Sequence, residues 1–473
     1  MNDVWTSTAH VRTDVLLAAG LILAVVATVH ILLRKAEVQA AVGWIGLVWF
    51  APITGSILYY LLGVNRVQRR ARRGRGIAVQ RAASDAGDAS NENHLRFLQR
   101  AVGRITRRPV LAGNAVQMFE NGDAAYPAML EAIGRARRSV GLSSYIFRDD
   151  VWGGRFIEAL SAAQRRGVAV RVLIDGIGGG WLLSAAYHCL RRNNVPAARF
   201  FHSLLPWRMP FINLRSHKKV LVIDGLIGFS GGMNIADQNV QAMKTKDPVV
   251  DTHFRIEGPV TTQLVENFLA DWSFAAGEML DGDAWFPAIP DGTGSPARVI
   301  DSGPDKDLEK IEFALLEAIA CAQESIAIMT PYFLPDDRMV TAVALAAMRG
   351  IEVDVVIPAV SDHKLVDWAT HANIGPMLMH GVRVWRCPPP FRHSKVVVVD
   401  GEWCLVGSCN WDIRSFRLNF ELCLEFYDRD LAATLTAHMQ RCRGSALTKS
   451  EFNARSLLCR LRDAAARLLM PYL

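Results

Sequence analysis

Two stretches of the chain carry the same polar residue types at the same spacing. They read HKKVLVIDGLIGFSGGMN at 217–234 and HSKVVVVDGEWCLVGSCN at 393–410. The shared positions are His217, Lys219, Asp224, Gly231 and Asn234 in the first stretch and His393, Lys395, Asp400, Gly407 and Asn410 in the second. Exchange at a phosphodiester needs a nucleophile, a proton donor for the leaving alcohol and positive charge around the non-bridging oxygens. Two facing His–Lys pairs would supply all three without a metal ion.

The residues between each His and Asp predict how the reactive groups are presented. β-Branched side chains fill both intervals, which predicts two buried strands. Because residues two apart in a strand share a face, each His points the same way as the Lys that follows it. The Asp has the opposite parity and opens an Asp-Gly dipeptide, which is a strong hairpin signal. We therefore expect Asp224 and Asp400 to form turns that support the two strands.

A catalytic His is usually held in one tautomer by a carboxylate on its other ring nitrogen. The candidates are Asp251 in VVDTHFRIEG and Glu421 in LNFELCLEF, which follow His217 and His393 by 34 and 28 residues. These comparable separations pair each acid with the His of its own stretch. The alternative is that both are ordinary acids at strand edges.

Other polar residues near the two stretches have structural alternatives. Asn234 and Asn410 lie in small-residue turns, where their side chains either donate to phosphate oxygens or only form the turn. Asp412 and Arg414 in NWDIRSF are expected to brace the second turn rather than to catalyse. The chain has no H-E-x-x-H, no Cys cluster and no G-x-x-x-x-G-K-[ST] loop, so we expect no metal and no cofactor. The eight Cys are expected to be reduced and mostly buried.

An internal repeat surrounds the two stretches and predicts the elements that position them. AIGRARRSVGLSSYIF at 132–147 matches AIACAQESIAIMTPYF at 318–333, and RGVAVRVLIDG at 166–176 matches RGIEVDVVIPA at 349–359. Strand and helix patterns alternate in both copies. We therefore expect an α/β fold with two halves related by a pseudo-twofold axis.

The N-terminal residues indicate a membrane protein. Val15 to Leu33 is apolar apart from Thr28 and His30 and is long enough to span a bilayer, with a signal peptide as the rival interpretation. Ala40 to Val64 is also apolar, and Pro52 and Gly55 predict a kink or a re-entrant shape there. The two segments predict a transmembrane helical hairpin. The arginines of RVQRRARRGR at 66–75 predict a cytoplasmic flank that binds anionic lipid.

Composition indicates membrane segments and an anionic partner, either phospholipid or nucleic acid. The chain has 473 residues, a formal charge of +7, only 21% charged residues and a mean hydropathy of +0.15.

LLPWRMPFIN at 204–213 is apolar and leads into His217, which predicts either core or a loop that touches acyl chains. RSLLCRLRDAAARLLMPYL at 455–473 interleaves Leu with Arg, which predicts an interfacial helix or a domain-packing helix.

These motifs resemble the H-x-K-x4-D signature of the phospholipase D superfamily, and the wider chain is similar to the bacterial cardiolipin synthases. The further motifs that carry the resemblance are DTHFRIEGP at 251–259, SGP at 302–304, TPYFLPD at 330–336 and GSCNWDIRSFRLNFE at 407–421. One departure is Gly232, which stands where such proteins often carry Ser or Thr, whereas the second stretch keeps Ser408. The departure puts the hydroxyl contact of the first half in question.

The resemblance implies an activity and a place in the cell. It implies that the reactive strands meet at the pseudo-twofold axis, with His217 as the nucleophile and His393 as the acid and base. It also implies a phosphatidyltransferase of the bacterial inner membrane that makes cardiolipin and glycerol from two phosphatidylglycerol molecules through a phosphatidyl-histidine. The alternatives are a phospholipase D that uses water, a nuclease, which the membrane hairpin disfavours, and a non-catalytic protein that binds anionic lipid. We expect no nucleic-acid partner.

The expected domain boundaries follow from these patterns. We expect a membrane hairpin with its basic flank, a linker, a first half, a second half and a C-terminal amphipathic helix, at 1–75, 76–109, 110–290, 291–445 and 446–473.

Overall fold

The computed structural model describes residues 2–35, 38–63, 94–180, 183–201, 214–290, 292–304 and 307–470. These residues belong to two compact units, one that contains the N-terminal helices and one that contains the α/β halves. The basic stretch at 66–75, most of the expected linker and the apolar segment at 204–213 fall in the remaining ranges. The predictions made for them therefore lie outside the described residues.

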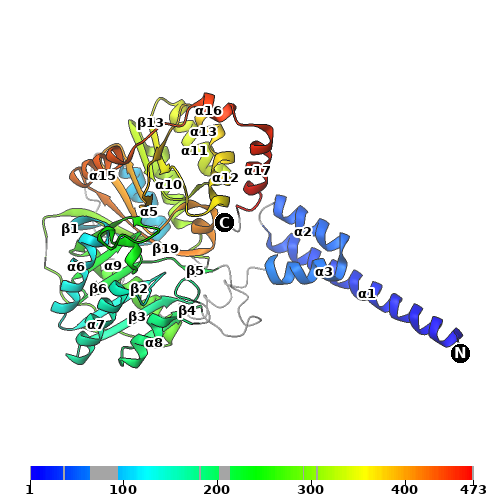
Figure 1. The fold of residues 1–473 in the computed structure, drawn as a ribbon, viewed down its shortest axis with the longest axis horizontal. Coiled ribbons are helices and arrows are strands. Elements are labelled where there is room, and N and C mark those ends of the chain that lie inside the picture. Colours follow the sequence, from blue (N-terminus) through cyan, green and yellow to red (C-terminus); the bar gives the residue numbers. More distant parts are fainter. Residues whose placement is uncertain are drawn as a thin grey trace. The chain divides into compact units, whose positions relative to one another are not determined.

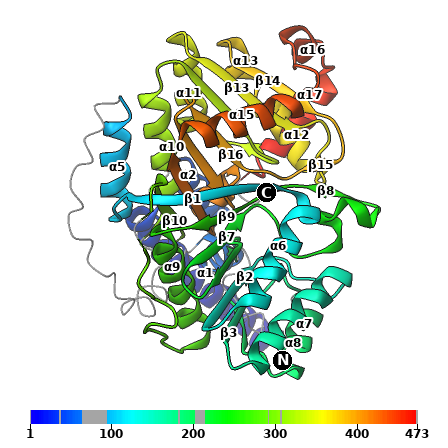
Figure 2. The same ribbon diagram turned by 90° about the vertical axis from the view of Figure 1, so that its left-hand side faces the viewer.

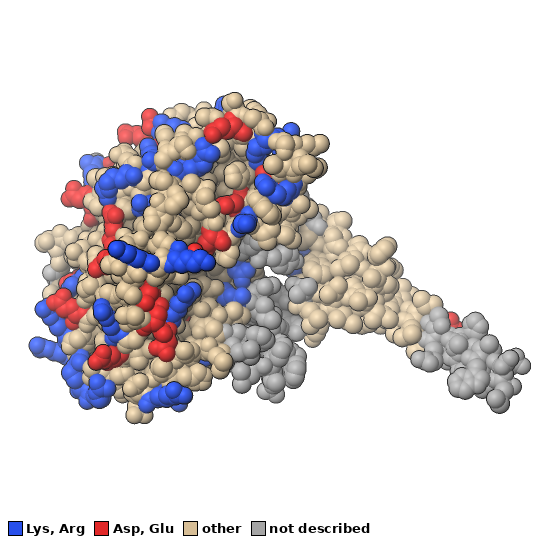
Figure 3. All heavy atoms as spheres, in the orientation of Figure 1, with Lys and Arg blue, Asp and Glu red and all other residues tan. Residues whose placement is uncertain are grey.

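The N-terminal unit is a helical hairpin. It contains α1 (Asn2–Arg34), α2 (Val38–Phe50), α3 (Pro52–Leu58) and a π-helical turn, η1 (Tyr59–Gly63). The helices pack around a small core of Ala24, Ala27, Ile31, Val48 and Tyr59. Asp14–Arg34 is long and apolar enough to cross a membrane, whereas the apolar helix Ala40–Phe50 is shorter. Figure 3 shows the described surface of this unit as almost entirely uncharged.

The kink expected near Pro52 is confirmed. Ala51 leaves the helical conformation with φ −135° and ψ 78°, and Pro52 starts α3 at the position where its missing N–H costs nothing. Two polar residues within the apolar part of α1 have partners, since Thr28 donates to the Ala24 carbonyl at 2.7 Å and His30 Nδ1 lies 2.7 Å from the Tyr59 hydroxyl. The break at Ala51 and Pro52 divides the second apolar segment into two short helices, so it is not one long span.

The first half alternates strands and helices after α5 (Arg96–Thr106). Its helices are α6 (Asn121–Arg135), α7 (Val151–Arg165), α8 (Ala185–Arg192) and α9 (Val260–Ala276). Its strands are β1 (Leu111–Glu120), β2 (Ser139–Ser144), β3 (Ala169–Asp175), β4 (Ala197–Phe200), β5 (Arg215–Ser216), β6 (Val220–Ile223), β7 (Ile227–Gly231), β8 (Val249–Val250) and β9 (Thr252–Glu257). Two 3₁₀ turns, η3 (Asp237–Asn239) and η4 (Gln241–Met243), precede β8.

The second half repeats this order. Its strands are β10 (Ser295–Ser302), β11 (Ser325–Met329), β12 (Phe333–Leu334), β13 (Glu352–Pro358), β14 (Arg383–Cys387), β15 (Phe391–Arg392), β16 (Val396–Val399), β17 (Trp403–Gly407), β18 (Trp411–Asp412) and β19 (Asn419–Tyr427). Its helices are α10 (Lys310–Cys321), α11 (Asp337–Met348), α12 (Lys364–Asn373), α13 (Gly375–Met379), α14 (Ile413–Arg417) and α15 (Arg429–Cys442), followed by α16 (Lys449–Asn453) and α17 (Leu457–Arg467).

One sheet runs through both halves, and its strand order is a mirror image about its centre. From β1 outward the order is β9-β7-β6-β2-β3-β4, and from β10 outward it is β19-β17-β16-β11-β13-β14. β1 pairs with β10 in antiparallel orientation, which joins the two series. Figure 2 shows β1 crossing the molecule, with β2, β3 and α9 of the first half below it and the second-half helices α10, α11 and α15 above it. This order confirms two α/β halves related by a pseudo-twofold axis.

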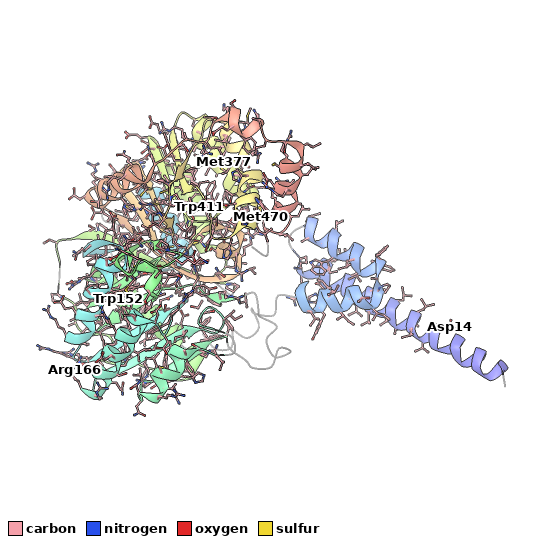
Figure 4. All side chains as sticks on the ribbon, viewed as in Figure 1. Asp14, Trp152, Arg166, Met377, Trp411 and Met470 are labelled. Atoms are coloured by element: carbon pink, nitrogen blue, oxygen red, sulfur yellow. The ribbon has the colours of Figure 1, made fainter. Side chains whose placement is uncertain are left out.

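Each half has its own apolar core on one face of the sheet. In the first half α6, α7 and α8 cover this face, and in the second half α10, α11 and α13 do so (Figure 1). In Figure 4 the labelled Trp411 and Met377 lie among the second-half elements, and both are buried. The opposite face of the first half is covered by α9, where a Cβ at Gly141 would collide with the Phe268 ring. The halves therefore fold as two layered bodies on a shared sheet.

Candidate active site

Both Asp-Gly dipeptides form the hairpin turns that follow the reactive strands. Asp224 and Asp400 have left-handed backbones with φ of 53° and 52°. The Asp224 carboxylate accepts hydrogen bonds from the backbone N–H groups of residues 137, 138 and 139. The Asp400 carboxylate does the same for residues 323, 324 and 325, and it also contacts His94 Nε2 at 2.7 Å. Each carboxylate thus ties its hairpin to the start of a neighbouring strand.

The two reactive histidines meet in one cleft. The ring centroids of His217 and His393 are 6.4 Å apart, with the ring planes 82° from parallel. Both line a cleft of about 640 Å³. Its other lining residues include Tyr145, Arg215, Asn234, Gln238, Tyr332, Asp362, Lys364, Phe391, Asn410, Asp412 and Arg414. Residues from both halves therefore form a single site.

Each histidine is oriented by a carboxylate from the opposite half. His217 Nδ1 lies 3.1 Å from Glu421 Oε2 and 2.9 Å from the Ser408 carbonyl, and His393 Nδ1 lies 2.8 Å from Asp251 Oδ2. The pairing within each half, which the sequence separations suggested, is wrong. The reason is strand pairing, because β5 lies parallel to the start of β19 and β15 lies parallel to β8. The strand that precedes each His is thus aligned with the strand that delivers the other half's acid.

The two carboxylates have different surroundings. Ser408 donates to Glu421 Oε2 at 2.5 Å, so this acid is held by the serine as well as by His217. Gly232 occupies the matching position beside Asp251, and a Cβ there would lie 2.7 Å from Asp251 Oδ2. The glycine that departs from the family pattern therefore makes room for the shorter acid. The hydroxyl contact seen at Ser408 has no counterpart at this position.

Lys219 and Lys395 are buried next to the two histidines. Lys219 Nζ donates to the His217 carbonyl at 2.6 Å and lies 5.3 Å from the centroid of the Tyr145 ring. Lys395 Nζ contacts the His393 carbonyl and lies 2.8 Å from His393 Nδ1. Burial, and then the charge of Lys395, lower the pKa of Lys219 to about 7. Burial likewise lowers the pKa of Lys395 to about 8, against the opposing charge of Asp251 and Glu421.

Burial favours the neutral form of both histidines. Burial lowers the pKa of His217 to about 4, although Glu421 acts in the opposite direction. Burial and Lys395 also lower the pKa of His393. Both partners of His217 Nδ1 are oxygen acceptors, so Nδ1 carries the proton of the neutral ring. Its Nε2 therefore presents a lone pair.

The asparagines of the two stretches also line the cleft. The Asn234 side-chain oxygen accepts a hydrogen bond from the Ile146 N–H at 3.2 Å, which leaves its amide donors available to the cleft. Asn410 lies at the equivalent place in the second half, and its backbone N–H donates to the Ser415 hydroxyl at 3.3 Å. The geometry accommodates both a turn role and a role in phosphate binding.

Sequence reasoning missed several residues of the cleft wall. Tyr332 donates to the Asp362 carboxylate at 2.9 Å, and the Tyr145 ring lies edge-on to His217 with centroids 5.0 Å apart. Arg215 was also missed, although it stands two residues before His217 and so shares its strand face. Asp412 caps α14 by accepting from the Ser415 N–H at 2.6 Å, which matches the bracing expected of it. Arg414 was expected only to brace the same turn but lines the cleft.

The described residues contain no group of three or more His, Cys, Asp or Glu that could hold a metal ion. The positive charge at the described site comes instead from side chains. These are Lys219 and Lys395 next to the histidines, and Arg215, Lys364 and Arg414 in the cleft wall.

Comparison with known proteins identifies similar sequences along most of the chain. The family model for the phospholipase D-like domain of cardiolipin synthase matches residues 129–272 and 315–443, and a phospholipase D-nuclease N-terminal model matches residues 22–63. A cardiolipin synthase of Staphylococcus aureus is 30% identical over 460 residues, covering 94% of this chain and 93% of the relative. Cardiolipin synthase A of Pseudomonas fluorescens is 32% identical over 465 residues, covering 95% and 96%.

A solved structure shares the fold at low sequence identity. The crystal structure of phosphatidylserine synthase from Haemophilus influenzae superposes with a TM-score of 0.61 at 16% identity, and it covers 80% of this chain and 100% of that one. At this identity the likeness bears on the fold alone.

Proposed function

Because this chain belongs to the family of cardiolipin synthases with phospholipase D-like domains, we propose that its cleft joins two phosphatidylglycerol molecules through a phosphatidyl-histidine. The enzyme is a phosphatidyltransferase that makes cardiolipin. The observation that carries the proposed mechanism is the pair of histidines from opposite halves, facing each other across one cleft, each held by a carboxylate.

In the first step His217 Nε2 attacks the phosphorus of one phosphatidylglycerol. A P–N bond forms, the bond between phosphorus and the glycerol oxygen breaks, and His393 gives its Nε2 proton to the departing glycerol. In the second step His393 takes a proton from the glycerol hydroxyl of another phosphatidylglycerol. That oxygen attacks phosphorus, the P–N bond breaks, and His217 is free again.

The assignment of roles rests on the resemblance and on the environments of the two rings. A nucleophile must be neutral, and the pKa of His217 of about 4 keeps it so throughout the physiological range. An acid must hold a proton, and a bound phosphodiester anion raises the pKa of His393 by adding negative charge beside it. Lys219 and Lys395 offset the charge on the non-bridging oxygens, and Asn234 and Asn410 are proposed to donate to them.

The test is product identification with the purified full-length protein in phosphatidylglycerol vesicles. Mass spectrometry should find cardiolipin and glycerol in equal amounts. Phosphatidic acid as the main product would instead mean that water is the usual acceptor, as in a phospholipase D. The difference between the two activities depends on how well the acceptor excludes water from the cleft.

We also propose that the N-terminal hairpin anchors the enzyme in the bacterial inner membrane with its catalytic halves in the cytoplasm. The outward-facing apolar residues of α1 suit a lipid environment, since Leu16, Ile22, Val26 and Leu33 are more than half exposed. The arginines at 66–75 favour a cytoplasmic flank. A reporter fused after Leu473 should be active only in its cytoplasmic form, and activity of a periplasmic reporter would overturn this topology.

The last element is proposed to rest on the lipid surface. α17 buries Asp463 and Ala466 and exposes Leu457, Leu458 and Leu461. Arg455 and Arg462 form ion pairs with Asp463 on the buried face of this helix. Such an apolar outer face suits the interface of a bilayer. Replacing the three leucines with serine should lower activity on vesicles more than activity in detergent micelles, and an equal loss in both would assign the helix to packing.

The domain boundaries remain part of the proposal. We propose a hairpin with its flank at 1–75, a linker at 76–109, halves at 110–290 and 291–445 and a terminal helical segment at 446–473.

A further inference from the structure

Two arginines line the cleft without a part in the steps above. Arg215 lies in β5, two residues before His217. Arg414 lies in α14, four residues after Asn410. One arginine comes from each half, so the pair forms only when the two halves are assembled.

The two guanidinium groups lie close enough to influence each other. Burial lowers the pKa of Arg414, and the charge of Arg215 lowers it further, whereas Asp412, Tyr145 and Asp175 act in the opposite direction. Tyr145 interacts with both arginines and shares a hydrogen bond with Arg215. Two like charges held together in a partly buried cleft repel each other, and an anion placed between them relieves that repulsion. Guanidinium groups bind phosphate with two parallel N–H···O bonds, which makes phosphate a suitable anion.

The arginine pair breaks the pseudo-twofold symmetry of the cleft. The displacement that relates His217 to His393 also relates Arg215 to Phe391 and Gln238 to Arg414. Phe391 and Gln238 line the cleft too, so the symmetry-related place holds an aromatic ring and a neutral amide. An arginine pair therefore occurs at one of two equivalent places, while Lys364 is the other cation that the described cleft wall presents. A requirement shared by the two His–Lys pairs would have placed an arginine pair at both.

We infer that Arg215 and Arg414 hold the phosphate of the acceptor lipid during transfer. The inference rests on the proposed function and adds to it a second anion site. Cardiolipin carries two phosphates joined by a glycerol, and only one of them passes between the histidines. A strand advances roughly 3.3 Å per residue, so Arg215 lies about 7 Å along the chain from His217, a span that a glycerol bridge can cover. The pair would select an acceptor that bears a phosphodiester over water or a simple alcohol.

The experiment lets two acceptors compete in the same vesicles. The full-length protein is given phosphatidylglycerol vesicles in buffer that contains ethanol, and the initial rates of cardiolipin and phosphatidylethanol formation are measured together. Both products arise from the same donor and the same intermediate, so their ratio reports on the acceptor alone. Arg215→Gln and Arg414→Gln should each lower the ratio of cardiolipin to phosphatidylethanol by about tenfold, since each removes a charged phosphate contact. Arg414→Lys should recover part of the ratio because it keeps the charge.

The matched control is Gln238→Ala, which alters the symmetry-related place in the same cleft. It should leave the ratio within about twofold of that of the native enzyme. A ratio that stays constant in both arginine variants would overturn the inference, whether or not the total rate falls. If Arg414→Gln fails to fold, Arg215→Gln and Arg414→Lys still decide the matter. A native enzyme that forms neither product would instead contradict the proposed function.

Discussion

On one side of the cleft His217 faces Glu421, whose carboxylate also receives the Ser408 hydroxyl at 2.5 Å. On the other side His393 faces Asp251, next to Gly232. The second side has a shorter acid and no hydroxyl, and its lysine lies against the histidine ring at 2.8 Å. The comparison teaches that the duplicated fold keeps one His–carboxylate pair on each side while the residues around each pair differ. The longer acid is accompanied by a serine hydroxyl, and the shorter acid is accompanied by a glycine. Two similar histidines can thus take two different parts in one reaction.

The largest expected effect separates the two histidines. His217→Ala should form no phosphatidyl-enzyme with any donor, because the nucleophile is gone. His393→Ala should lower turnover of phosphatidylglycerol by about 10²–10⁴-fold, since the leaving alkoxide departs unprotonated. A donor with a nitrophenol leaving group needs little protonation and should restore labelling of His393→Ala but not of His217→Ala. Radiolabel transfer to the protein measures both.

Two outcomes would change the roles assigned to the two histidines. If the nitrophenol donor labels His217→Ala and not His393→Ala, the two histidines exchange roles. If the native enzyme is never labelled while it still makes cardiolipin, the covalent route is wrong.

The next effect converts one side of the site into a copy of the other. Gly232→Ser should push the Asp251 carboxylate away from His393, because the new Cβ would collide with both of its oxygens. We expect turnover to fall by about 10–100-fold, as losing or misaligning a charged hydrogen bond costs roughly 1.5–3 kcal/mol. Adding Asp251→Glu recreates the Ser–Glu pair of the other side and should recover part of the activity. Steady-state kinetics of the single and double variants measure the recovery, and a double variant no better than the single one would mean that the two pairs are not interchangeable units.

A smaller effect concerns the pH dependence set by the two lysines. Their pKa values of about 7 for Lys219 and about 8 for Lys395 lie below the ordinary range, so both lose their charge as pH rises through 7 to 8. The charged forms are present below these values and bind phosphate. The value of kcat/KM, which reports on the free enzyme, should therefore begin to fall above about pH 7 and fall more steeply above about pH 8. The fall in kcat should come at higher pH, because bound phosphate favours the charged lysines, and coincident limbs would assign the fall to another group.

The smallest expected effect on the chemistry concerns a pair that only the first half has. Lys218 and Asp271 form a buried ion pair at 2.7 Å, whereas Ser394 stands at the place equivalent to Lys218. Lys218→Met removes the cation of this buried ion pair, and removing one partner of a buried pair costs about 3–5 kcal/mol. We expect a melting temperature several degrees lower for this variant and a nearly unchanged one for Ser394→Ala. Thermal unfolding in detergent measures both, and equal melting temperatures would mean that the pair contributes little.

Much of the fold could be predicted from the sequence because its signals are local. Strand parity and the Asp-Gly dipeptides placed Asp224 and Asp400 in turns, and Pro52 marked the break in the second apolar segment. The internal repeat predicted the two halves that the mirrored strand order shows. The turn and kink signals depend on neighbouring residues, and the repeat is visible because its two copies share one residue pattern, so a single sequence contains all three.

The crossed carboxylates could not be predicted, because the crossing depends on contacts between distant segments. β5 and β19 pair through Arg215 and Asn419, and no local pattern indicates that a two-residue strand reaches the other half. The separations of 34 and 28 residues suggested the opposite pairing. Arg215 was missed for a different reason, since its parity with His217 was visible but a single basic residue ahead of a strand is a weak signal.

The crossed pairing also orders events on the ribosome. His217 is translated 204 residues before Glu421, and Asp251 is translated 142 residues before His393. A nascent chain that already displays the first reactive strand therefore has an imidazole without its carboxylate and no partner histidine. The site is assembled only when the end of the second half has emerged and folded. A chain cut short anywhere before Glu421 would therefore lack the carboxylate that orients His217.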